Sequence, residues 1–225
     1  MTVSQLPIAH QWSLHSMQLV NWGCFDGHLR VEFAGSRQVT LITGSTGSGK
    51  STLLDAHIVL MHNPSTALNR ASNTTSHRSR SGETRNIVSY MRGVQGQTRD
   101  VDGERDVLLR EGTVWSAIAE TWHSTDGSVL TAISAFFSTQ ADTVRPQVRR
   151  DAWIAAEFDL RWLEPFATGQ HLASPFPKRV LEKTYPGLQV VDSTVALHRA
   201  LWERLGIGDE DAGKNAMSLL YKVQA

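Results

Sequence analysis

The chain lacks several features that mark common classes of protein. Cys24 is its only cysteine, so a disulfide framework and a thiolate metal site are both excluded. No apolar run approaches the roughly 18 residues that a transmembrane helix needs. Residues 1–17 have no basic start followed by an apolar stretch, so no secretory signal is expected. These absences favour a soluble protein in a reducing, cytoplasmic setting.

An excess of either charge is also missing. The chain carries 22 basic and 22 acidic residues, so no overall field draws it toward nucleic acid or a membrane surface. Arginine greatly outnumbers lysine among the basic residues; this bias suits phosphate pairing but can also follow from genome composition. With 225 residues, 40% of them hydrophobic, the chain can bury a core in one or two domains.

What the sequence does contain is a glycine-rich motif, LITGSTGSGKSTLLDA, at residues 41–56. The fixed positions of the pattern G-x-x-x-x-G-K-S fall on Gly44, Gly49, Lys50 and Ser51, with a further glycine at Gly47. Glycines allow several backbone N–H groups to point inward at phosphate oxygens, and a following helix adds its positive end. The motif therefore predicts a loop that binds nucleotide phosphates.

Each position of the loop has an expected role. Lys50 would bridge the β- and γ-phosphates, the Ser51 hydroxyl would hold Mg²⁺, and Thr52 would donate to the α-phosphate. The motif lies between an expected strand and an expected helix, which is the context that separates it from a chance match. The predicted nucleotide-binding residues are Gly44, Ser45, Thr46, Gly47, Ser48, Gly49, Lys50, Ser51 and Thr52.

Hydrophobic patterning predicts an α/β chain around this motif. Apolar–polar alternation predicts strands over residues 12–20, 28–33, 113–123, 129–137 and 152–160, and short extended runs over 38–43 and 187–191. The 38–43 run is rich in β-branched residues and predicts a buried strand that enters the loop. Helical spacing predicts helices over 50–61, 175–185, 194–205 and 212–222.

The sequence also predicts one long loop and the two ends of a helix. Polar residues 62–86 predict a long mobile loop. Asp192 or Ser193 is expected to cap the helix over 194–205, which Gly206 would end.

The residues around the loop resemble a known family. Residues 19–27 contain an N-W-G-x-F turn, an Asn/Ala/Ser-rich segment occupies 68–72, and an S-Y-x-R-G step spans 89–93. Together with GKSTLLDA, these features resemble the N-terminal head half of SMC-like ATPases. They look most like the MukB/MksB-like, JetC-type proteins of bacterial Wadjet systems, which are a plasmid defence. Residues 219–225 resemble the segment that enters the coiled coil.

The resemblance implies an ABC/SMC-head-like mixed sheet with an antiparallel β-subdomain, and a composite site for ATP and Mg²⁺. In that family the N-terminal half supplies the phosphate loop and a glutamine near the Mg²⁺ and water. By position the candidate is Gln224, for which an ordinary exposed glutamine is the alternative. The C-terminal head half supplies the Walker B strand and the signature motif. Two heads then close around ATP.

The same resemblance implies partners. These are the C-terminal head half and a second head, kleisin-type subunits, and DNA bound nonspecifically, with no membrane partner. Arg92 lies in the S-Y-x-R-G step and is the candidate DNA contact. The arginines between residues 70 and 110 have a simpler interpretation as part of a solvated loop that does not bind DNA, because acidic residues are interleaved with them.

One departure from the family limits the predicted activity. Residues 1–225 contain no LSGG-type signature, and only Leu188–Asp192 resembles a Walker B strand, although capping is the more ordinary role for Asp192. We therefore expect the N-terminal half of a head, with residues 175–225 leading toward a coiled coil, that hydrolyses little ATP alone. A self-contained P-loop small-molecule kinase and a binding-only remnant are the alternatives.

For three side chains outside the loop, packing in the core is the more ordinary interpretation. Trp22 and Phe25 could pack near an adenine, but aromatic residues beside a hairpin more often fill a core. His57, on the helix after the loop, is interpreted as a packed histidine.

Overall fold

The computed structural model describes residues 11–35, 39–61, 68, 86–100, 103–139, 148–167 and 176–206. Its elements are β1 (Trp12–Trp22), β2 (Phe25–Glu32), α1 (Lys50–Met61), α2 (Ile87–Arg92), β3 (Val94–Asp100), β4 (Gly103–Leu108), β5 (Val114–Ser124), β6 (Val129–Ser138), β7 (Arg149–Ala155), the 3₁₀ helix η2 (Leu160–Leu163), α3 (Glu164–Ala167), α4 (Lys178–Thr184), β8 (Gln189–Val191) and α5 (Thr194–Leu205).

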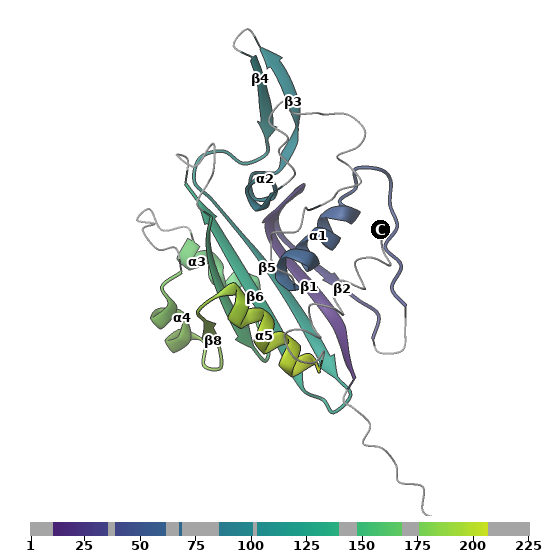
Figure 1. Ribbon diagram of the computed structural model, residues 1–225, viewed down its shortest axis with the longest axis vertical. Helices are drawn as coiled ribbons and strands as arrows, with labels where there is room; N and C mark the ends of the chain where they lie inside the picture. Colours follow the sequence, from purple (N-terminus) through teal and green to yellow (C-terminus); the bar gives the residue numbers. More distant parts are fainter. Residues whose placement is uncertain are drawn as a thin grey trace, which may run out of the picture.

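Six of the strands form one sheet in the order β2-β1-β5-β6-β7-β8, and every neighbouring pair is antiparallel. The helices α1 and α5 lie across one face of this sheet, as Figure 1 shows. A separate hairpin of β3 and β4 projects beyond the end of the sheet (Figure 1). Strand β8, at the opposite edge from β2, follows the short helix α4.

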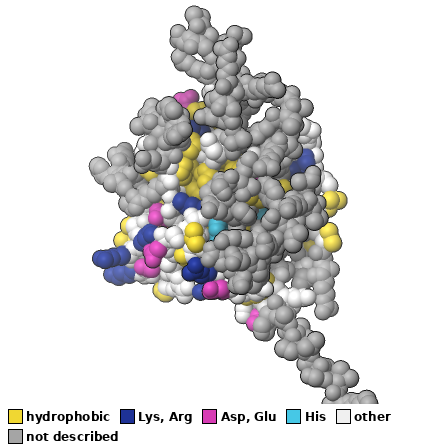
Figure 2. Space-filling model, viewed as in Figure 1, with side chains coloured by type: hydrophobic (Ala, Val, Ile, Leu, Met, Phe, Trp, Pro, Cys, Tyr) yellow, Lys and Arg dark blue, Asp and Glu magenta, His cyan; other side chains and the backbone are white. Residues whose placement is uncertain are grey.

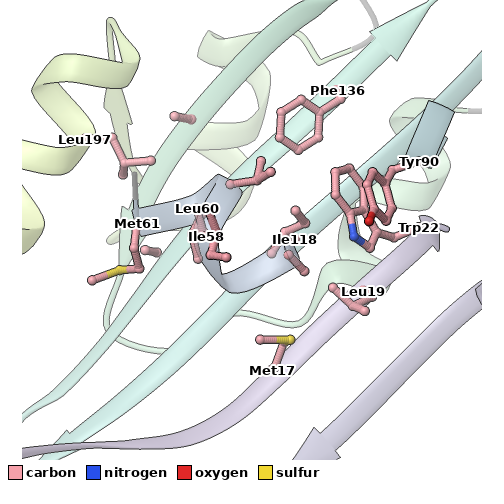
Figure 3. Close-up of a cluster of buried hydrophobic side chains, with 14 of the residues drawn as sticks. Met17, Leu19, Trp22, Ile58, Leu60, Met61, Tyr90, Ile118, Phe136 and Leu197 are labelled. Carbon is pink, nitrogen blue, oxygen red and sulfur yellow. The ribbon is translucent and has the colours of Figure 1, made fainter. Parts of the chain in front are cut away.

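Both faces of the sheet are covered by apolar clusters. On β5, Ile118 and Trp122 join the cluster that contains the buried residues of α1, α2 and α5, and Figure 3 shows part of it. Ala117 and Ala119 point to the other face and join residues of η2, α3 and α4. Because the central strands are covered on both sides, their residues are buried almost continuously and do not alternate between buried and exposed.

The helices that flank the sheet agree with the sequence where local signals are strong. The predicted helices over 50–61 and 194–205 have those bounds as α1 and α5. Ser193, one of the two predicted caps, accepts a hydrogen bond from the amide of Ala196 at 3.1 Å, and α5 ends in left-handed Gly206. The other predicted cap, Asp192, does not cap the helix.

The strand predicted at 38–43 is wrong for the residues that the structure describes. Residues 39–43 form no strand, and Val39 and Leu41 are 94% and 82% exposed. The α/β class holds, but every described strand pair is antiparallel, so the predicted mixed sheet is not present in this part of the chain. The physical reason is that a β-branched run becomes a strand only when another strand accepts its backbone hydrogen bonds.

Other boundaries also moved. The strand predicted over 152–160 is β7, which ends at Ala155 before η2 begins, and the helix predicted over 175–185 is the shorter α4. No prediction covered α2 or the β3–β4 hairpin. The predicted loop over 62–86 and the helix over 212–222 lie outside the described residues, apart from Leu68 and Asn86.

None of the helices within the described ranges combines the length and the apolar character needed to cross a bilayer.

Candidate nucleotide-binding site

The predicted phosphate loop is an open turn that leads directly into α1. Residues 41–48 are all exposed, Gly49 is half-buried, and α1 begins at Lys50. Gly47 and Gly49 have φ angles of 82° and 91°, in the left-handed region that side chains disfavour. The glycines therefore let the backbone turn sharply in front of a twelve-residue helix whose first amides are available to an anion.

Lys50 folds back over this loop. Its Nζ donates to the carbonyl oxygens of Gly44 at 2.7 Å and Ser45 at 2.8 Å, and to Oγ of Ser48 at 3.4 Å. A Cβ added at Gly44 would lie only 2.6 Å from the same Ser48 Oγ, so the loop is closed tightly around a glycine. The ammonium group thus lies at the loop that would hold phosphate oxygens, and its bonds there are exposed to solvent.

The remaining loop residues divide into exposed and buried ones. Thr46 and Ser51 are exposed, so the Ser51 hydroxyl is accessible to a metal ion. Thr52 is buried: its carbonyl accepts from Nε1 of Trp22 at 3.3 Å, and its Oγ1 lies 4.0 Å from Sγ of Cys24. The predicted contact of Thr52 with an α-phosphate stays a prediction.

The turn between β1 and β2 is in close contact with the end of the phosphate loop. A Cβ added at Gly49 would lie 2.5 Å from Cζ of Phe25 and 2.9 Å from Sγ of Cys24. A Cβ at Gly23 would lie 2.4 Å from Cγ2 of Thr52. The two segments are therefore in such close contact that each requires a glycine where they meet.

Trp22 belongs to the core rather than to a base-binding surface. Its side chain is fully buried and stacks on Tyr90 at a ring-centroid distance of 4.9 Å (Figure 3). Phe25 is partly buried against the same cluster. The interpretation of Trp22 as a core residue is confirmed, and its indole N–H also fixes the first turn of α1 through Thr52.

Helix α2 is fastened to α1 behind the loop. Its start is fixed by a reciprocal capping box, in which Asn86 and Ser89 each accept from the other's amide. The Tyr90 hydroxyl then donates to the buried carboxylate of Asp55 on α1. This bond connects the helix that begins at the phosphate loop to the helix that carries the S-Y-x-R-G step.

The candidate DNA contact, Arg92, ends α2 and is buried. Its guanidinium donates to the carbonyl oxygens of Gly112 at 3.1 Å and Thr139 at 3.0 Å. A phosphate contact would require those bonds to be exchanged, and the DNA role stays a prediction.

The structure describes only one of the two other predicted polar candidates. Gln224 lies outside the described residues. Asp192 is exposed beside β8, the outermost strand of the sheet.

Sequence reasoning missed the side chains that support the loop from behind. Asp55 and Tyr90 were seen only as parts of flanking motifs, and Arg110 only as one of many arginines. Their contacts join segments that are far apart in the chain, for example Tyr90 with Asp55 at a separation of 35 residues. No local periodicity signals such a pair, although a carboxylate on the apolar face of a predicted helix indicates a buried partner.

The geometry fits a nucleotide with Mg²⁺. The left-handed glycines, the ammonium group over the loop, the accessible Ser51 hydroxyl and the helix N-terminus are the groups that bind nucleoside phosphates and their metal ion. They define a P-loop NTPase domain on an α/β scaffold.

A comparison with known families supports that class. A family model described as the P-loop containing region of AAA domain matches residues 14–75, which cover most of β1, all of β2, the phosphate loop and α1. No curated protein matches the chain. Nucleotide binding at the loop is therefore supported both by the geometry and by the match to this family model.

Proposed function

We propose that this chain is the ATP-binding half of a composite, SMC-like ATPase head. The observation that carries the proposal is the segment just before the phosphate loop. Val39, Leu41 and Ile42 form an apolar run that is exposed and pairs with no strand in the described part of the chain. Figure 2 shows hydrophobic side chains at the right edge of the molecule, on the side where this segment runs in Figure 1.

A P-loop normally follows a buried strand of a parallel sheet. Here the sheet that is present is antiparallel and lies under α1, while residues 39–43, which lead into the loop, pair with no strand among the described residues. An apolar strand supplied by another polypeptide segment would bury this run and pair its backbone. In an SMC-like head that segment would also bring the acidic residues that position Mg²⁺ and water.

Closure of two such heads around ATP, and their release after hydrolysis, would drive movement of DNA. In this scheme these residues would hold the nucleotide: Lys50 would neutralise the β- and γ-phosphates, the loop amides would cradle them, and Ser51 would hold the metal ion.

A self-contained small-molecule kinase is less well supported. Such an enzyme needs arginines placed over the γ-phosphate and an acidic base beside the acceptor. Arg92 and Arg110 instead direct their guanidinium groups at backbone carbonyls. Within the described residues, Asp55 is buried against Tyr90.

The test is a titration of the chain with MgATP by calorimetry, coupled to an assay for released phosphate. We expect the wild type to bind MgATP with a Kd below about 1 mM, and Lys50→Ala to bind it at least tenfold more weakly. We expect no multiple turnover of ATP by the chain alone. Lys183→Ala, at an exposed position on α4, is the matched control and should bind as the wild type does. Ser51→Ala should weaken the dependence of binding on Mg²⁺.

Two results would count against the proposal in different ways. Equal binding of MgATP by the wild type and Lys50→Ala would show that the nucleotide does not bind at this loop. Multiple turnovers abolished by Lys50→Ala would keep the nucleotide site but show that no second half is needed, and a substrate-dependent release of ADP would favour the kinase.

A further inference from the structure

A single buried arginine joins the β1–β2 turn, residues 22–26, to the end of α2. Arg110 follows β4 at the base of the projecting hairpin, and its side chain is 9% exposed. An arginine has five N–H donors, and all five are engaged here. The acceptors are the carbonyl oxygens of Met91 (2.7 Å), Gly23 (2.9 Å), Tyr90 (3.0 Å) and Phe25 (3.2 Å), and the carboxylate of Asp26 (3.4 Å).

The position of Arg110 has an electrostatic cost that its bonds offset. Burial lowers the pKa of Arg110, and the nearby carboxylate of Asp26 acts in the opposite direction. Four of the five acceptors are neutral carbonyls, so the guanidinium is held mainly by hydrogen bonds to the backbone. A desolvated cation in this arrangement fixes two backbone segments, residues 23–26 and 90–91, at once.

Both segments that Arg110 joins contact the end of the phosphate loop or the helix that follows it. The β1–β2 turn lies against Gly49 and Thr52, as the close approaches of Phe25 and Gly23 show. The end of α2 holds α1 through Tyr90 and Asp55. The Gly23 amide also donates to the Tyr90 carbonyl at 2.8 Å, so the turn and α2 are bonded to each other as well.

We propose that Arg110 is a positioning residue for the nucleotide site, because it holds the β1–β2 turn against Gly49 and so keeps the phosphate loop in its binding conformation. This inference rests on the proposed function. Arg110 touches no loop residue itself in the described contacts and acts through the turn. Loosening the turn would let Gly49 leave its left-handed conformation, and a loop that must be reordered on binding has a lower affinity.

The test compares Arg110→Lys with the wild type in two measurements. Lysine keeps the charge but has one ammonium group with three donors, which cannot replace the five bonds that Arg110 makes to the two segments. We expect an affinity for MgATP about tenfold lower, and hydrogen exchange of the Gly23 amide at least about tenfold faster under native conditions, with little change in the amides of β5. Arg161→Lys, at a surface arginine bonded to Asp159, is the matched control and should change neither quantity.

A purely structural role gives a different result. It would lower the free energy of unfolding and raise exchange throughout the sheet, without a selective effect at the turn or on MgATP affinity, and that result would overturn the proposal. If Arg110→Lys does not fold, Arg110→Gln, which keeps two donors, takes its place. The exchange measurement needs no nucleotide, so unchanged exchange overturns the proposal, whereas a wild type that binds no MgATP counts against the proposed function.

Discussion

Nδ1 of His57 lies 2.8 Å and 3.0 Å from the two carboxylate oxygens of Glu120. His57 is in the middle of α1, and Glu120 is on the sheet face beneath it. The glutamate side chain is fully buried, whereas the histidine side chain is 34% exposed. The interpretation of His57 as a packed histidine is thus confirmed, with the addition that it is the partner of a buried carboxylate.

Removing His57 should leave the Glu120 carboxylate buried without its partner. We expect His57→Leu to lower the free energy of unfolding by about 3 kcal/mol, because an uncompensated buried charge is strongly destabilising. The double variant His57→Leu/Glu120→Leu should recover most of that loss, since two apolar residues replace the pair. Urea denaturation followed by circular dichroism measures both, and a double variant no more stable than the single one contradicts this account.

The same pair should make stability depend on pH. Burial acts to lower the pKa of His57, but the charge of Glu120 and its hydrogen bond outweigh burial and raise that pKa above its ordinary value of 6.5. The folded state therefore favours the protonated ring. The resulting stabilisation is fully present below about pH 6.5 and is lost as the pH rises through the raised pKa of the folded state.

The measurement is the difference between the wild type and His57→Gln in free energy of unfolding, from pH 6 upward. The difference is needed because burial lowers the pKa values of His28 and His123, whose contributions have the opposite sign. We expect the advantage of the wild type over His57→Gln to shrink as the pH rises. An advantage that stays constant or grows would show that Glu120 does not hold a protonated ring.

Gly49→Ala should harm both stability and nucleotide binding. The new Cβ would meet Phe25 and Cys24 at a φ of 91°, so contact and backbone strain add. The matched control is Gly127→Ala, in the β5–β6 turn, with a φ of 86° and nothing within 4 Å of the new Cβ. We expect a cost of about 1 kcal/mol for the control and about 2–3 kcal/mol at Gly49.

Thermal or urea unfolding gives the two stabilities, and titration with MgATP gives the affinities. Only the Gly49 variant should lose affinity. Equal losses of stability in the two variants would mean that the β1–β2 turn yields freely to the added methyl group.

The apolar run before the loop should contribute little to the stability of the chain alone. We expect Val39→Thr/Leu41→Thr to change the free energy of unfolding by less than about 0.5 kcal/mol, because both side chains are exposed. Val59→Thr, at a fully buried position of α1, should be clearly destabilising by comparison.

The same double variant should reduce self-association in sedimentation velocity, because an exposed apolar run with unpaired backbone is a template for strand pairing. A large loss of stability in Val39→Thr/Leu41→Thr would show that the run is buried in solution, and the argument for a partner strand would fail.

Local signals account for what could be predicted. The bounds of α1 and α5, the Ser193 cap and the glycine loop all follow from residues within a few positions of one another. The conformation of residues 39–43 could not be predicted in the same way, because a strand needs a partner strand that the local pattern does not contain. The contacts of Arg110 reach Gly23 across 87 positions, and no periodicity points to them.

By itself, the sequence determined that this protein has a phosphate loop between an apolar run and a helix, because the backbone conformations of such a loop require glycines at set spacings. Only the tertiary structure decided what holds that loop. The β1–β2 turn, α2 and Arg110 come together behind it because a buried guanidinium and buried carbonyls must find partners wherever the fold brings them. Strand pairing also depends on distant segments, and the run that enters the loop is exposed because no described strand pairs with it.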